Sequence, residues 1–187
     1  MKKTLTTRKI VLTALLAALT YVSSGIRITI PLDLGGTTSF HLGNVLCTLS
    51  GLLMGPWLGG LAAGLGSMLY DMLNPLYLAT CWMTFLMKGA CGLVSGLVVR
   101  LFSSNWGYWK AVFATAAGAV TYGLLYVAKT YFYSGLLLKG LEPEAAMLTV
   151  VAKLPATIVN AVAAVVIAPV LAVAIQKALK KQRLFPD

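Results

Sequence analysis

The stretch that decides the fold is FHLGNVLCTLSGLLMGPWLGGLAAGLGSMLYDMLN, residues 40–74, which is almost wholly apolar and is broken once, at Gly55-Pro56. Proline cannot continue a helix interior, so this break predicts two short helices joined by a tight turn. Small residues recur every four positions after the break, at Gly55, Gly59, Ala63 and Ser67. Such spacing flattens one helix face and lets another backbone approach closely, as is typical of helices packed in a membrane bundle.

The whole chain shares this apolar character. Its 187 residues are 59% hydrophobic and 11% charged, whereas a soluble domain carries about 25% charged residues. The net charge is +10, but the basic residues gather near the two ends of the chain. This distribution indicates charge that sets membrane topology, not a surface for nucleic acid. We therefore expect an integral membrane protein.

Six apolar segments predict one all-α membrane domain over residues 1–187 with six transmembrane helices. The segments are about 9–24, 42–54, 57–73, 78–101, 108–134 and 146–178. The positive-inside rule predicts that both termini are cytoplasmic. Residues 26–41 alternate apolar and polar side chains, so we expect an extended outer loop there. The first segment also resembles a signal peptide, but its length favours a membrane span.

No set of residues typical of an enzyme occurs in the sequence. There is one histidine, there are five acidic residues, and HExxH, GxSxG and Walker motifs are absent. The three cysteines lie in apolar segments without metal-ligand spacing. We therefore expect no catalytic residues, no cofactor and no metal site. Because the P-loop is missing, any ATP hydrolysis must take place in a partner protein.

Polar side chains within the apolar segments are the remaining candidates for function. A charge that faces lipid is costly, so Lys88 should face the bundle interior or a watery cavity. Tyr122, Tyr126, Lys129 and Tyr133 recur at spacings of three and four, which places them on one helical stripe. We add to these the polar and aromatic residues near the predicted helix ends. The predicted substrate-binding residues are then His41, Tyr70, Asp71, Asn74, Trp82, Lys88, Tyr126, Lys129, Tyr133 and Asn160.

Several of these residues also have a structural interpretation. Trp82 and Tyr133 could anchor helix ends at the membrane interface, to which Lys129 could extend as well. Asp71 could hold Lys88 in an ion pair or contact a ligand, and the sequence supports both equally.

Aromatic rings with a few polar groups form a typical pocket for a small planar solute. Lysines beside tyrosines suit a hydroxylated or anionic heteroaromatic ring, such as a pyridoxine-like compound, a pyrimidine or riboflavin. The alternative is a self-sufficient secondary transporter of a small aromatic solute, which would need an internal repeat and coupling-ion carboxylates. No convincing repeat is visible, so a binding protein is favoured.

The chain resembles the substrate-binding S components of energy-coupling factor (ECF) vitamin transporters, and most of all their riboflavin-type branch. The resemblance covers nearly the whole length and rests on RKIVLTALLAALTYV (8–22), on residues 40–73 and on WMTFLMKGACGLVSGLVVRLF (82–102). It implies a multi-pass protein of a prokaryotic plasma membrane, whose 26–41 loop covers the ligand. It also implies a transmembrane coupling subunit that docks on Ala14 and Ala18, and two ATPase subunits that drive inward release. Because this branch contains receptors for several vitamins, the resemblance does not select one substrate.

Overall fold

The computed structural model describes residues 6–32, 36–102 and 107–181 and is mostly helical. Its α-helices are α1 Thr7–Gly25, α2 Gly43–Met54, α3 Pro56–Met72, α4 Cys81–Leu101, α5 Tyr108–Ala128 and α6 Pro143–Lys181. A short 3-10 helix, η1 (Leu78–Thr80), precedes α4, and a π-helix, η2 (Lys129–Leu138), continues α5. In the part of the chain that the structure describes, three helical stretches are long and apolar enough to cross a membrane: Leu78–Leu101, Tyr108–Leu138 and Pro143–Ala178. The predicted helical membrane fold is thus confirmed in its main features.

A two-stranded hairpin corrects the all-α prediction. Strand β1 (Arg27–Leu32) pairs antiparallel with β2 (Gly36–His41), so that Arg27 lies opposite His41. The alternating pattern predicted an extended segment, and the structure folds that segment back on itself. Pairing the two strands gives their backbone N–H and C=O groups partners that a single extended strand would lack.

Helices α2, α3 and α4 are in contact through glycine backbones. Gly55, at φ 79°, allows the tight turn between α2 and α3, and Pro56 begins α3 at a position that needs no backbone hydrogen bond. A Cβ atom on Gly51 of α2 would overlap the carbonyl oxygen of Gly92 on α4. A Cβ atom on Gly92 would lie 3.0 Å from the carbonyl oxygen of Gly59 on α3. The predicted small-residue spacing therefore serves close backbone packing inside the chain.

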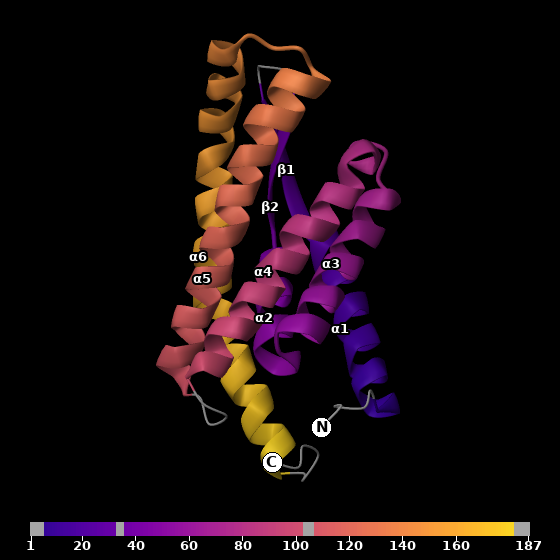
Figure 1. Cartoon of the computed structure of the whole chain (residues 1–187), viewed down its shortest axis with the longest axis vertical. Helices are drawn as coiled ribbons and strands as arrows, with labels where there is room; N and C mark the ends of the chain where they lie inside the picture. Colours follow the sequence, from indigo (N-terminus) through magenta and orange to yellow (C-terminus); the bar gives the residue numbers. More distant parts are fainter. Residues whose placement is uncertain (1–5, 33–35, 103–106, 182–187) are drawn as a thin grey trace.

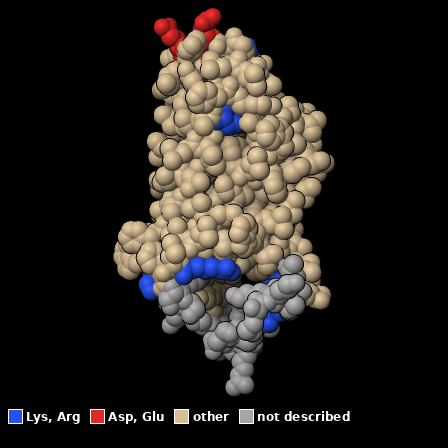
Figure 2. All heavy atoms as spheres, viewed as in Figure 1, with Lys and Arg blue, Asp and Glu red and all other residues tan. Residues whose placement is uncertain are grey.

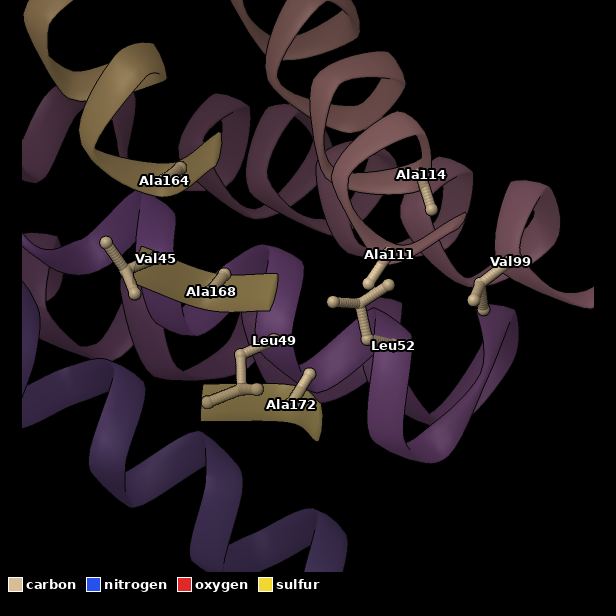
Figure 3. Packing of buried hydrophobic residues seen from close by; sticks show 9 residues of the cluster. All are labelled: Val45, Leu49, Leu52, Val99, Ala111, Ala114, Ala164, Ala168 and Ala172. Atoms are coloured by element: carbon tan, nitrogen blue, oxygen red, sulfur yellow. The ribbon is translucent and has the colours of Figure 1, made fainter. Parts of the chain in front are cut away.

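A second group of small and branched apolar residues joins α2 to the later helices (Figure 3). Alanines on α5 and α6 face valines and leucines on α2 and α4, and all are buried: Val45, Leu49, Leu52, Val99, Ala111, Ala114, Ala164, Ala168 and Ala172. Because alanine side chains are short, α6 can lie close to α2 along this contact.

The long axis of the molecule separates two chemically different ends. The start of α1 and the end of α6 lie at one end, and the connection between η2 and α6 lies at the other (Figure 1). In Figure 2 the acidic residues stand at the η2–α6 end, most basic residues on this face lie toward the opposite end, and a broad uncharged surface separates them. Such an apolar band between polar ends is typical of a protein embedded in a bilayer.

Candidate functional site

A cavity of about 330 Å³ lies between the hairpin and the helix ends nearest the η2–α6 connection. Side chains from the hairpin, α3, α4, α5, η2 and α6 line it. Small-molecule sites measure roughly 300–1,000 Å³ and combine apolar walls with a few fixed polar groups. The size of this cavity falls within that range, and its lining is more polar than that of a typical site.

Lys88 reaches the cavity from α4, although its side chain is only 4% exposed. Its ammonium group donates a hydrogen bond to Oδ1 of Asn44 and lies 4.5 Å from the centroid of the Tyr122 ring. A buried charge is tolerated where polar atoms and an aromatic face replace water. As predicted, Lys88 faces the bundle interior and a cavity.

Asp71 lines the same cavity but does not pair with Lys88. Its carboxylate accepts a hydrogen bond of 2.6 Å from the hydroxyl of Thr84, and among the described residues no ion pair joins it to Lys88. The sequence left two roles open for Asp71. Since Lys88 uses Asn44 and Tyr122, the structural ion pair is the interpretation that the geometry contradicts.

Two polar attachments hold the hairpin over the cavity. Asn160 of α6 accepts a hydrogen bond from the backbone N–H of His41 (2.9 Å) and donates one to the carbonyl oxygen of Ser39 (2.8 Å). At the other strand, the Arg27 guanidinium lies 4.2 Å from the ring centroid of Tyr70 and 5.0 Å from that of Tyr77. The side chain of Asn160 thus binds strand β2 through both of its polar atoms.

The π-helix changes which side chains of the predicted stripe reach the cavity. Tyr122, Tyr126 and Lys129 line it, with the two tyrosine rings stacked at 5.8 Å. After Lys129 the helix continues with hydrogen bonds between residues five apart, so the positions that follow are rotated relative to those of an α-helix. Ser134 therefore lines the cavity and Tyr133 does not.

His41 lies at the end of β2 with a half-buried side chain that lines the cavity. Burial, together with the nearby charges of Lys88 and Arg27, lowers the pKa of His41 well below its usual 6.5, so the imidazole is neutral near pH 7. Its Nδ1 atom is buried without a hydrogen-bond partner among the described residues, as is the side-chain nitrogen of Asn44. His41 lines the cavity and Asn44 bonds Lys88, so both atoms have unused hydrogen-bonding capacity close to cavity residues.

Six of the ten predicted substrate-binding residues line the cavity, and four do not. Tyr70 packs against Tyr21 and Arg27, and Asn74 accepts a hydrogen bond from the N–H of Leu76 within its own turn. Trp82, which is 47% exposed, meets Tyr133 edge to face at 5.8 Å. These four do not line the cavity. For Trp82 and Tyr133, the geometry supports the structural interpretation.

Several polar residues of the cavity wall were not predicted, namely Ser24, Arg27, Thr38, Ser39, Ser67, Tyr77, Thr80, Thr84, Ser134, Lys139, Lys153 and Thr157. The sequence carried a signal for one of them. Lys153 stands seven residues before Asn160, two helical turns away, and so shares its face of α6. Within the described residues, no cluster of three or more His, Cys, Asp or Glu side chains could hold a metal ion.

Comparison with known proteins agrees with this architecture. A family described as "ECF-type riboflavin transporter, S component" matches residues 4–177. A Pyrococcus woesei protein described as "Uncharacterized protein in gap 3'region" is 30% identical over 119 residues, which are 63% of this chain and 74% of that protein. The chain therefore belongs to the ECF-type riboflavin transporter S component family, whose members are multi-pass membrane proteins that serve as substrate-binding subunits in vitamin uptake.

Proposed function

We propose that this S component captures one small water-soluble vitamin or precursor from outside the cell and releases it inward when partner ATPases act. The supporting observation is the polar, tyrosine-lined cavity beneath the hairpin, at the end of the molecule opposite the start of α1 and the end of α6. Both termini then lie in the cytoplasm, all six helices cross the bilayer, and the cavity opens outward. A pyridoxine-like compound, a pyrimidine or a riboflavin-like compound suits its rings and polar groups.

The face of α1 that turns away from the bundle suits a partner subunit. Ala14 and Ala18 are both exposed, while Thr13, Leu16 and Thr20 face inward. Small residues four apart let another helix approach closely in a membrane. We propose that a transmembrane coupling subunit docks here and links the chain to two ATPase subunits.

The proposed function is tested by mass spectrometry of small molecules that copurify with the protein, followed by uptake assays in liposomes. We expect a ring-containing vitamin or precursor in the extract. We also expect negligible uptake by the chain alone and ATP-dependent uptake with the coupling subunit and ATPases. Efficient uptake by the chain alone without ATP would instead favour a secondary transporter.

Lys88→Met tests whether the cavity is the binding site. We expect at least a tenfold loss of affinity for the copurified compound, since a charged partner contributes about 1.5–3 kcal/mol. Lys110→Met is the matched control, because Lys110 bonds the carbonyl oxygen of Phe102 outside the cavity. Equal binding by wild type and Lys88→Met in isothermal titration calorimetry would remove Lys88 from the site.

Ala18→Leu tests the docking face. We expect the variant to fold and bind ligand normally but to lose copurification with the coupling subunit, because the added side chain holds the helices apart. Ala128→Leu, at an exposed alanine of α5, is the control. Undiminished complex formation by Ala18→Leu would place the docking face elsewhere.

A further inference from the structure

The charges around the cavity are strongly unbalanced. Its described lining contains five cationic side chains, Arg27, Lys88, Lys129, Lys139 and Lys153, and one carboxylate, Asp71. His41 adds no charge near pH 7, because burial and its cationic neighbours lower its pKa. The lining therefore has a formal excess of four positive charges. This is unusual, because charges within membrane proteins usually pair with one another.

The partners of the inner cations leave this excess in place. Arg27 donates to the carbonyl oxygen of Ser24 and lies over two tyrosine rings, and Lys88 donates to the amide of Asn44. These partners are neutral, so they solvate the cations without compensating their charge. The carboxylate of Asp71 bonds a hydroxyl group, that of Thr84.

The outer cations are Lys129 on η2, Lys139 directly after η2 and Lys153 on α6. Lys129 donates a hydrogen bond of 3.3 Å to the Thr80 hydroxyl and so points into the cavity wall, not toward the membrane interface. Lys153 has no hydrogen-bond or ion-pair partner among the described residues, and its ionisable neighbours are Lys129, Lys139 and Tyr77. Like charges held this close repel one another, and an anion placed among them would turn repulsion into attraction.

We propose that the ligand carries an anionic group, a carboxylate or a phosphate, which binds between Lys129 and Lys153 while its ring lies against Tyr122 and Tyr126. This inference rests on the proposed function and narrows its substrate class. Charge-assisted hydrogen bonds from several ammonium groups give such an anion both affinity and a fixed position. The stacked tyrosines supply an apolar wall for the ring.

Pairs of probes that share a ring and differ in charge test the inference. Riboflavin and riboflavin 5′-phosphate, pyridoxine and pyridoxine 5′-phosphate, and uracil and orotate are titrated against purified protein by calorimetry at low salt. In at least one pair, we expect the anionic member to bind about tenfold or more tightly than the neutral one. The first two pairs report on phosphate and the third on carboxylate.

Variants connect the preference to Lys129 and Lys153. Lys153→Gln and Lys129→Gln should each weaken binding of the anionic member about tenfold and leave the neutral member nearly unchanged. Lys177→Gln, the same substitution on an exposed lysine at the far end of α6, should change neither. Melting temperatures without ligand verify that each variant is folded.

The outcomes separate the inference from the function on which it rests. A neutral member that binds as tightly as its anionic partner in every pair that binds would overturn the anionic class and leave vitamin binding intact. An anionic preference that survives both lysine variants would place the anion elsewhere and overturn the proposed subsite. Binding of no member of any pair would count against the proposed function, and with it this inference.

Discussion

Helices α2, α3 and α4 meet through glycine backbones, whereas the hairpin is joined to the helices by a small number of polar contacts. In the first region, Gly51 and Gly59 bring backbone atoms so close that a methyl group does not fit, and at Gly92 a methyl group would be tightly packed. In the second, Asn160 supplies two hydrogen bonds and Arg27 lies over two tyrosine rings. The cavity lies next to the hairpin, and these glycines do not line it.

This difference implies that the hairpin can move at a low cost in free energy, whereas α2, α3 and α4 cannot separate at a low cost. Packed backbones have no alternative arrangement at low cost, because any separation forfeits many dispersion contacts at once. Breaking the Asn160 attachment costs only about 2 kcal/mol, since a hydrogen bond contributes about 1 kcal/mol net. We therefore propose that ligand enters by movement of the hairpin, while the glycine-packed helices stay rigid.

The largest loss of folding stability is expected from Gly51→Ala. Its methyl group would overlap the carbonyl oxygen of Gly92, which must separate α2 from α4 and cost about 3 kcal/mol or more. Gly123→Ala is the matched control, because its Cβ atom would lie 4.0 Å from the nearest atom, in Thr157. Size-exclusion chromatography and thermal unfolding in detergent should show loss of folded protein for the first variant alone. A Gly51→Ala protein as stable as wild type would mean that these helices are not rigidly packed.

Asn160→Ala is expected to change the rate of ligand release and to have a smaller effect on stability. Loss of both hydrogen bonds to β2 should speed ligand release roughly tenfold to thirtyfold, at about 1 kcal/mol for each bond. The unfolding temperature should change little, because the glycine contacts remain. Stopped-flow measurement of the dissociation rate tests this, with Asn74→Ala as a control that loses only a bond within its own turn. Unchanged release with a large fall in stability would reverse the assigned roles.

The smallest effect is expected on the free energy of unfolding at acidic pH, through the hairpin residue His41. Because the folded protein lowers the pKa of His41 below 6.5, the unfolded chain takes up a proton first as the pH falls. Stability from this residue is therefore unaffected above pH 6.5 and should fall by about 1 kcal/mol between pH 6.5 and 5.5. His41→Gln should lose less stability than wild type over this interval in thermal unfolding. Identical losses in both proteins would show that His41 is not held neutral.

Much of the helical framework was predictable, because its causes are local. Apolar runs and breaks such as Gly55-Pro56 mark helices and their ends, and spacing by fours marks the faces that pack closely. Lys88 was also assignable, since a charge in an apolar helix must turn inward. The hairpin pairing was not, because alternation predicts an extended strand but not its partner.

The candidate site also has a part that the sequence predicts and a part that it does not. Its residue types, tyrosines with lysines and a single carboxylate, follow from the sequence because few polar groups occur in the later helices. Which of them meet was decided by tertiary structure. In the π-helix, Ser134 lines the cavity and Tyr133 does not, and Asn44 takes the place beside Lys88 that was one of two roles open to Asp71. The π-helical conformation and the contact between Lys88 and Asn44 both depend on how whole helices pack. The spacing of residues within one segment therefore does not predict them.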